Sequence, residues 1–406
     1  MTTSTTNRSV IRAVPAAWHG IGFWIIAVVF TTVMAYSTVP TPLYVLYEAR
    51  DGFPSFAVTF IFAAYAVGVV ASLYFAGHIS DWVGRRRIIL ISVAVEILAS
   101  CLFIAWPDLP GLLVARFVNG VGVGMLTATA TAHLSELRVI SRSDGSADAS
   151  TVSGVANLGG LGLGPLIGGL FAEFLPQPLL VPHVVFLALF VVAVIGVALV
   201  PETVVKEEIR PAYRPQKVSV PRESRAVFFA AGAAAFSSFA VFGLFTSLAP
   251  TFLVVTLHET DRLVAGAVSF SVFAAACLGQ VLLSKARIRT QLNVLLALLP
   301  VGLVGLAVGA AAASLPVFAA SGVVAGAGVG LLFRAALSTG ASLAGAESKG
   351  EVLAALFLIA YAGLCIPVLL VGGALVIASP LAVLLVFVVL VLTAVLVSAI
   401  NMRRRH

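Results

Sequence analysis

Twelve long apolar stretches run through the chain and constrain its fold more than any other feature. A helix needs about 20 apolar residues to cross a hydrocarbon core of ~30 Å. Only 10% of the 406 residues are charged and 60% are hydrophobic, whereas roughly 25% of the residues of a soluble domain are charged. A water-soluble fold of this size cannot bury such a surplus. We therefore exclude a soluble enzyme, a disordered chain and a secreted disulfide scaffold, and predict an integral membrane protein.

The predicted fold class is an all-α membrane protein with twelve transmembrane helices. The stretches are continuously apolar, whereas strands of a membrane barrel alternate over about ten residues. The predicted spans are 20–45, 57–79, 88–105, 111–131, 152–171, 184–200, 226–255, 264–283, 292–312, 315–333, 352–377 and 381–400. Residues 202–225 form the one long polar interruption. We expect an N-terminal six-helix bundle (1–201), a cytoplasmic linker (202–225) and a C-terminal six-helix bundle (226–406).

The positions of lysine and arginine predict the orientation, because these residues favour the cytoplasmic side of a membrane. With the N-terminus placed inside, the cytoplasmic side receives all of the 24 basic residues except Arg50, Arg116 and Arg262. Both termini are therefore predicted to be cytoplasmic, in a multi-pass protein of the cell inner membrane. Because the net charge of +7 mainly follows this topology, we expect no nucleic-acid partner.

The two halves of the chain repeat each other weakly. The run STVPTPL from Ser37 is similar to SLAPTFL from Ser247, and NGVGVGML from Asn119 is similar to AGAGVGLL from Ala325. Transporters built from parallel repeats place the substrate site between the repeats, near the middle of the membrane. The repeat therefore predicts two pseudo-symmetric bundles with a site between them.

The first of three motifs lies in the short loop between the second and third spans. It combines two glycines, one acid and three arginines: Gly77, Asp81, Gly84, Arg85, Arg86 and Arg87. Glycine permits a tight turn, and an acid is stabilised at a helix N-terminus. From the residues alone, a simple turn flanked by cytoplasmic arginines is an alternative.

The second motif places Arg116 and Asn119 in the fourth span, followed by glycines that permit close helix packing. An arginine within a span is costly and indicates a functional site by default. The alternative is an arginine that extends its charged end to the membrane surface.

The third motif lies in the fifth span. Its members are small residues and a proline: Gly160, Gly164, Pro165, Gly168 and Gly169. The proline removes a backbone hydrogen bond and bends the helix, and the glycines let a neighbouring helix approach. Ordinary packing of small residues is the alternative interpretation.

Together, the three motifs and the twelve spans resemble the major facilitator superfamily, in its twelve-helix drug/proton antiporter type. The resemblance implies the major facilitator fold and a cytoplasmic gate at the first motif, where Asp81 engages residues 348–352 at the start of the eleventh helix. It further implies that Arg116 takes part in proton coupling, and that the third motif is an antiporter motif typical of exporters. Asn119 stands where the family more often has glutamine. The run Pro201-Glu202-Thr203 is also typical of the family.

Glu96 is the acid placed deepest in a predicted span, about 12 Å along the third helix at 1.5 Å per residue. A carboxyl group at this depth indicates a functional site, and we expect Glu96 to couple protons together with Arg116. The alternative is a structural partner for a neighbouring polar group. The expected lining of the substrate cavity is mostly aromatic and consists of Tyr36, Tyr44, Tyr65, Asn119, Phe242 and Tyr361.

These features predict a secondary active transporter that exports small amphipathic or lipophilic compounds in exchange for protons by alternating access. The alternative is a proton symporter or facilitator for uptake of a small nutrient or metabolite. The six histidines are scattered and no phosphate-binding loop is present, so we expect no enzyme activity, no metal and no cofactor. The expected partners are a small-molecule substrate, protons and the lipid bilayer, and the expected state is a monomer.

Overall fold

The computed structural model describes residues 15–54, 56–76, 79–142, 146–204, 224–343 and 349–403. Within these ranges, twelve helices are long and apolar enough to cross a membrane. The chain is therefore a multi-pass membrane protein, and the predicted all-α class is confirmed.

The first six spans comprise one broken and five continuous helices. The broken span consists of α1 (Ala16–Tyr36), the 3-10 turn η1 (Thr41–Leu43) and α2 (Tyr44–Asp51). The others are α3 (Phe56–Ala76), α5 (Arg85–Ala105), α6 (Leu109–Ser141), α7 (Ser146–Phe174) and α8 (Val181–Leu199), and the short α4 (Ser80–Val83) precedes α5.

The last six spans repeat this plan. The seventh span consists of α9 (Arg225–Gly243), the π-helical turn η3 (Leu244–Leu248) and α10 (Ala249–Leu257). It is followed by α11 (Arg262–Leu282), α12 (Ile288–Ala311), α13 (Leu315–Leu343), α14 (Lys349–Ala374) and α15 (Pro380–Arg403).

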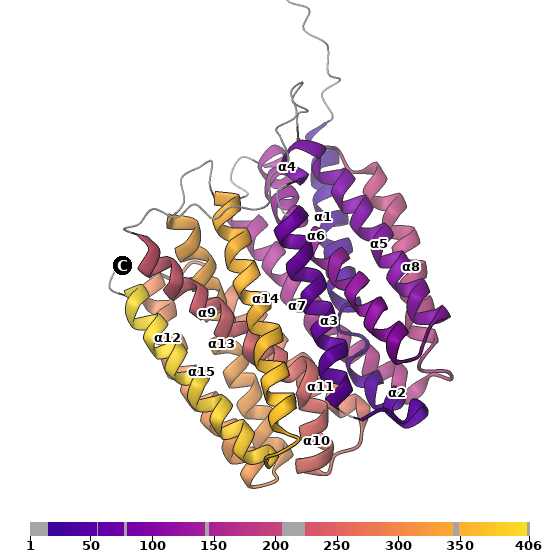
Figure 1. The fold of residues 1–406 in the computed structure, drawn as a ribbon. Helices are drawn as coiled ribbons and strands as arrows, with labels where there is room; N and C mark the ends of the chain where they lie inside the picture. Colours follow the sequence, from indigo (N-terminus) through magenta and orange to yellow (C-terminus); the bar gives the residue numbers. More distant parts are fainter. Residues whose placement is uncertain are drawn as a thin grey trace, which may run out of the picture.

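The helices form two bundles that lie side by side, with α1 to α8 on one side and α9 to α15 on the other (Figure 1). The bundles meet along two helix pairs, α7 against α11 and α3 against α14. In contrast, α5 and α8 lie on the far side of the first bundle, and α12 and α15 on the far side of the second. Any site between the halves is therefore lined by α3, α7, α11 and α14 together with the helices that pack behind them.

Prolines account for the break in the first span. Pro40 and Pro42 lack the backbone N–H that would continue the helical hydrogen bonds, and α1 ends at Tyr36, just before them. The corresponding place in the seventh span is also irregular, because α9 passes through η3 before α10 begins. Both the first and the seventh span are therefore interrupted near their ends.

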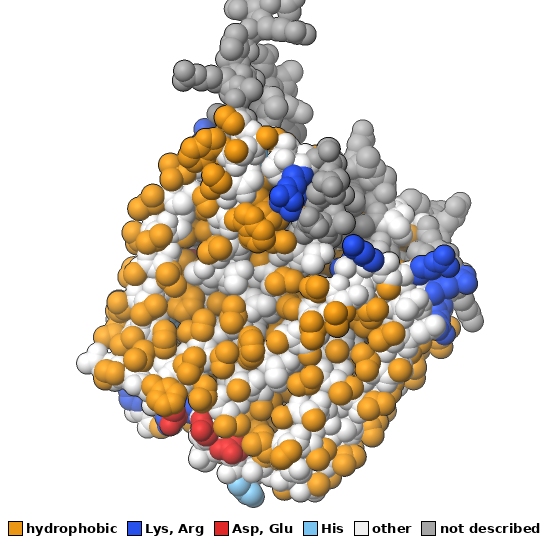
Figure 2. Space-filling view, turned by 180° about the vertical axis from the view of Figure 1, so that it is seen from behind, with side chains coloured by type: hydrophobic (Ala, Val, Ile, Leu, Met, Phe, Trp, Pro, Cys, Tyr) orange, Lys and Arg blue, Asp and Glu red, His pale blue; other side chains and the backbone are white. Residues whose placement is uncertain are grey.

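The helices extend beyond the apolar spans read from the sequence. The fourth span was expected to end at residue 131, but α6 continues to Ser141, because a helix remains stable after it leaves the apolar core. At the α4 end of the molecule, exposed lysine and arginine side chains gather, and a broad hydrophobic surface lies between this end and the opposite one (Figure 2).

Candidate functional site

Glu96 and the two polar residues of the second motif, Arg116 and Asn119, meet inside the first bundle. The amide of Asn119 donates a hydrogen bond of 2.6 Å to Glu96 Oε2. On its other side, Arg116 Nη1 donates to Asn119 Oδ1 over 3.2 Å. The Asn119 amide therefore links the carboxyl group of Glu96 to the guanidinium of Arg116, and a change of charge on one group acts on the other.

The chain break after α1 positions Arg116. The last carbonyls of a helix lack intrahelical donors, and Arg116 Nη1 donates to the carbonyl of Ser37 over 2.6 Å. The guanidinium also lies over the ring of Tyr65, 4.5 Å from its centroid, an attractive arrangement for a cation and an aromatic face. Because Arg116 is only 1% exposed, it does not extend its charge to the membrane surface.

Glu96 faces the interior of the bundle although α5 lies on the bundle's far side. The side chain is fully buried and points at Gly122 of α6, where an added Cβ would overlap Glu96 Oε1. The other carboxyl oxygen is bonded to Asn119, whereas Oε1 is buried without a hydrogen-bond partner in the part of the chain that the structure describes. Buried polar atoms are nearly always paired, so an unpaired carboxyl oxygen indicates a functional group.

The third motif packs α7 against helices of both bundles. Gly160, Gly164 and Gly168 follow at intervals of four and face α1, because a Cβ at any of them would overlap that helix or η1. On the other face, a Cβ at Gly169 would stand 2.7 Å from the carbonyl of Arg262 in α11. The motif therefore brings the two bundles together next to the broken first span.

The carbonyl left free by Pro165 finds its donor in the neighbouring helix. A proline inside a helix removes the hydrogen bond to the carbonyl four residues before it, which is that of Leu161. Thr38 Oγ1 donates to this carbonyl over 2.9 Å. A hydroxyl from the break after α1 thus pairs with the carbonyl that the proline of α7 leaves without a donor.

At the cytoplasmic end by the predicted orientation, Glu202 holds the start of α5. Its carboxylate accepts the backbone N–H of Arg85 over 2.9 Å and that of Arg86 over 3.1 Å, which is the favourable place for a negative charge on a helix. Gly84 has a φ of 112°, and a Cβ there would stand 2.5 Å from Glu202 Oε2. This position therefore requires glycine.

Arg85 is the centre of the first motif. Its guanidinium forms ion pairs with Asp81 at 2.5 Å and with Glu136 at 3.0 Å. Glu136 also accepts a short hydrogen bond from Thr203. Arg87 is exposed. The loop motif is thus tied to the ends of α6 and α8 in its own bundle.

The inter-bundle part of the predicted gate remains a prediction. Asp81 was expected to engage residues 348–352, and within the structure its described ion-pair partner is Arg85. Gly77 lies outside the described residues, as does Ser348.

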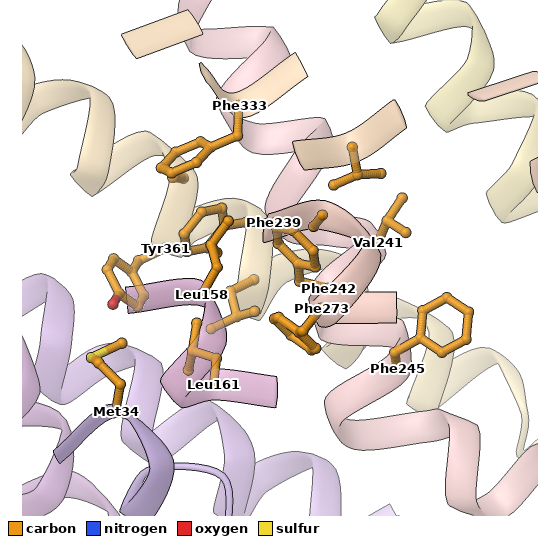
Figure 3. Close-up of a cluster of buried hydrophobic side chains, with 14 of the residues drawn as sticks. Met34, Leu158, Leu161, Phe239, Val241, Phe242, Phe245, Phe273, Phe333 and Tyr361 are labelled. Carbon is orange, nitrogen blue, oxygen red and sulfur yellow. The ribbon is translucent and has the colours of Figure 1, made fainter. Parts of the chain in front are cut away.

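The second bundle contributes an aromatic wall at the boundary between the bundles. Phe239 and Phe242 of α9 are fully buried. Phe242 stacks on Phe273 of α11 at 4.6 Å between centroids, and Phe239 lies 5.2 Å from Tyr361 of α14. Figure 3 shows these rings facing apolar side chains of the first bundle. Those apolar side chains are Met34, Leu158 and Leu161.

Three tyrosine hydroxyls near this boundary are buried without a hydrogen-bond partner among the described residues. They belong to Tyr44, Tyr65 and Tyr361. Tyr65 and Tyr361 come from α3 and α14, the pair of helices that meet between the bundles, and their place in a substrate cavity stays a prediction. Unpaired buried hydroxyls can bind polar atoms of a ligand.

The expectation that Tyr36 lines the substrate cavity is wrong. Its ring lies inside the first bundle, 5.1 Å from Phe186 and 5.2 Å from Phe190 of α8. The hydroxyl is 3.0 Å from Nδ1 of His183, a residue that sequence reasoning did not connect with the site. Because α1 is apolar all round, its sequence gave no sign of which face carries Tyr36 inward.

No three His, Cys, Asp or Glu side chains come close enough to hold a metal ion in the described ranges. The chemistry available at the site is therefore that of a carboxyl group, a guanidinium, an amide and phenols. These groups can bind polar ligands and exchange protons.

Comparison with known proteins agrees with this architecture. Residues 19–368 match the model of the Major Facilitator Superfamily. A segment of 73 residues is 38% identical to the multidrug resistance protein MdtL of Shewanella sp. (strain ANA-3), covering 18% of each chain. A segment of 115 residues is 34% identical to the puromycin resistance protein pur8 of Streptomyces alboniger, covering 28% of this chain and 22% of that relative.

A solved structure extends the similarity over nearly the whole chain. The human organic anion transporter MFSD10 (TETRAN) superposes with a TM-score of 0.71 at 15% identity, covering 94% of this chain and 99% of that chain. This similarity shows the fold alone. Proteins of the matched family are transporters and not enzymes. With 350 consecutive positions matched and the twelve-helix fold in place, the chain belongs to the Major Facilitator Superfamily.

Proposed function

We propose that this transporter exports small amphipathic or lipophilic compounds in exchange for protons, by alternating access of the two bundles to a site between them. The observation that carries the proposal is the contrast between the two sides of that site. The first bundle supplies buried groups that can hold a charge or a proton, and the second supplies an aromatic wall. A compound with one polar and one apolar part matches both sides.

The polar side supports proton coupling. Glu96 is neutral when protonated and charged when it has released the proton, and Asn119 passes this change to Arg116. When Glu96 is charged, it draws the Asn119 amide and holds the positive charge of Arg116 at its present place, where the guanidinium can attract the polar part of a substrate. When Glu96 is protonated, it no longer holds Arg116 in this way. The proton and the substrate therefore favour different arrangements of the site, as exchange requires.

Two further observations support export and the orientation. The antiporter motif packs against both bundles, and two relatives matched over short segments are described as resistance proteins. The exposed basic side chains gather at the α4 end, which is consistent with a cytoplasmic position for that end and for both termini. Rocking of one bundle against the other would then open the site to either side.

The test is proton movement across proteoliposomes that contain the purified protein. A panel of lipophilic amines, puromycin among them, and of lipophilic carboxylic acids is added outside, and a pH-sensitive dye reports the inside. A compound of the panel that moves protons against its own flux only with the intact protein supports the proposal. Movement of compound and protons in the same direction would instead indicate the uptake alternative, and movement of compound without protons would contradict coupling.

The matched variants are Glu96→Gln and Asn119→Leu. The first keeps an uncharged group of nearly the same shape, and the second removes the amide that links Glu96 to Arg116. Both are expected to lose proton movement while Glu96→Gln still binds the compound. Phe242→Ala removes part of the aromatic wall and is expected to weaken binding of the most lipophilic compounds first.

A further inference from the structure

We propose that Tyr47, His183 and Tyr36 form a path that carries protons from the α2 end of the molecule to Glu96. This inference rests on the proposed role of Glu96 as the proton carrier, and adds the route by which the proton reaches it. The path runs inside the first bundle, separate from the substrate site between the bundles.

The three side chains form a continuous line of hydrogen bonds. The hydroxyl of Tyr47 is 3.3 Å from Nε2 of His183, and Nδ1 of the same ring is 3.0 Å from the hydroxyl of Tyr36. The line thus crosses α2, α8 and α1. All three side chains are fully buried, so water does not compete for these bonds.

The inner end of the line lies next to Glu96. Ser100 and the Glu96 carboxyl group of α5 are among the polar groups in the electrostatic surroundings of the Tyr36 hydroxyl. Ser100 lies one helical turn after Glu96 on α5 and donates to its backbone carbonyl over 2.9 Å. The line therefore ends beside Glu96, whose Oε1 has no partner among the described residues and is available to accept a proton.

The outer end lies close to the surface. Above Tyr47, the guanidinium of Arg50 lies 5.1 Å from the ring centroid. Arg50 forms an ion pair with Asp51, and their side chains are 41% and 23% exposed. At its outer end, the path is therefore separated from water by the side chains of Arg50 and Asp51.

The chemistry of each member suits the transfer of a proton. A neutral imidazole has one N–H and one acceptor nitrogen, and a phenol hydroxyl both donates and accepts. A proton taken up at Nε2 of His183 allows Nδ1 to release its own proton to Tyr36, whose hydroxyl proton then passes toward Glu96. No bond between heavy atoms changes. One proton enters at Nε2 and one leaves from Nδ1, so each passage converts the neutral ring from its Nδ1–H to its Nε2–H tautomer.

The charged groups around these three side chains favour transfer of the proton over its retention at His183. The charged groups that face the line are Arg50 and Asp51 at its outer end and Arg116 at its inner end. Asn119 and Tyr65 complete the polar surroundings of Glu96. Burial and the positive charge of Arg116 both disfavour an imidazolium at His183, so a proton is not retained there.

A purely structural role would explain the rings but not the polar atoms. Phe103 stacks on His183 at 4.5 Å with an angle of 6° between the ring planes, and Phe186 and Phe190 enclose Tyr36. Phenylalanine at all of these positions would fill the same space. Instead, a hydroxyl faces each ring nitrogen of His183, which a relay requires and packing does not.

The experiment measures how fast the proton of Glu96 is replaced, and it needs no substrate. The purified full-length protein in nanodiscs is transferred from H2O to D2O, and time-resolved infrared spectroscopy follows the carboxylic C=O band, which shifts on deuteration. The band of Glu96 is the one that Glu96→Gln removes. The test variants are Tyr36→Phe, Tyr47→Phe and His183→Gln. Tyr74→Phe and His258→Gln are the controls, because both residues are exposed.

The path predicts that exchange at Glu96 slows at least about tenfold in the test variants, because a positioned proton-transfer group typically contributes on the order of 10²-fold or more. The controls keep the rate of the unmodified protein. If His183→Gln does not fold, Tyr36→Phe and Tyr47→Phe decide, since each removes one oxygen atom and keeps the ring.

Exchange at the unmodified rate in Tyr36→Phe and Tyr47→Phe overturns the path, as does the absence of a Glu96 carboxylic band at every pH at which the protein remains folded. The proposed function is tested separately by compound-driven proton movement in the unmodified protein. If that movement occurs and exchange does not slow, only the path is wrong. If exchange slows and no compound moves protons, the path stands and the transport proposal is wrong.

Discussion

The hydrogen bond between Thr38 and the carbonyl of Leu161 is predicted to stabilise α7 at Pro165. Thr38→Val keeps the shape of the side chain and removes the hydroxyl that donates over 2.9 Å. The carbonyl is then buried without a donor, because Pro165 supplies none. Leaving a buried acceptor unpaired costs about 1–3 kcal/mol, and hydrogen bonds between membrane helices average about 0.6 kcal/mol with a maximum near 1.7. We expect a loss of about 1–2 kcal/mol in the free energy of unfolding.

The second half of the test restores the missing donor. Pro165→Ala supplies a backbone N–H that can bond to the Leu161 carbonyl as in an ordinary helix. Thr38→Val should then cost less in the Pro165→Ala background than in the unmodified protein. The control is Thr31→Val, because Thr31 donates only to Ala27 four residues earlier in its own helix.

The assay is reversible unfolding of the purified protein in mixed micelles with increasing fractions of a denaturing detergent, followed by tryptophan fluorescence. The unmodified protein, Thr38→Val, Pro165→Ala, the variant with both substitutions and the control Thr31→Val are measured under the same conditions. An equal cost of Thr38→Val in both backgrounds would refute the reasoning, since the hydroxyl would then not be compensating for the proline.

Three further predictions concern the other contacts of the site. Gly84→Ala should destabilise the protein by about 1–3 kcal/mol, because its φ of 112° strains any other residue and the added Cβ displaces the helix cap; thermal melting checks this against Gly373→Ala, a position without a positive φ that has open space around it. Gly164→Ala should abolish transport in proteoliposomes, because the added Cβ overlaps α1, whereas Gly373→Ala, with no atom nearby, should not. Glu202→Ala should lower the melting temperature by removing a cap worth roughly 1 kcal/mol, and an unchanged melting temperature would exclude the capping role.

Much of the fold follows from local sequence signals. Spans of about 20 apolar residues admit only helices in a bilayer, because every backbone group must be paired within the segment. The breaks at Pro40, Pro42 and η3 were also predictable, since proline and the repeat point to the same places.

Part of the site was predictable for a different reason. A charged or amide side chain is so costly within a span that Glu96, Arg116 and Asn119 stood out individually. Their mutual contacts were not predictable, because the rotation of each helix about its axis depends on packing that the uniformly apolar sequence does not record. For the same reason Tyr36 was placed in the substrate cavity, whereas it faces His183.

Contacts between segments far apart in the chain could not be predicted from the sequence. Thr38 meets Leu161 across 123 positions and Glu202 meets Arg85 across 117. A proline in a helix signals a carbonyl without a donor, but the sequence does not say which neighbouring helix supplies one. Likewise, the Pro201-Glu202-Thr203 run indicates a role for Glu202, but the sequence does not show that its partners are the backbone N–H groups of Arg85 and Arg86.

The central claim is that Glu96 couples the movement of protons to that of the exported compound. The most direct measurement loads proteoliposomes with a compound that the panel identifies, imposes a pH gradient, and compares gradient-driven accumulation with exchange of labelled for unlabelled compound. The account predicts that the unmodified protein accumulates the compound on the acidic side, and that Glu96→Gln retains exchange but only equilibrates the compound. Accumulation by Glu96→Gln that follows the pH gradient as in the unmodified protein would contradict the account.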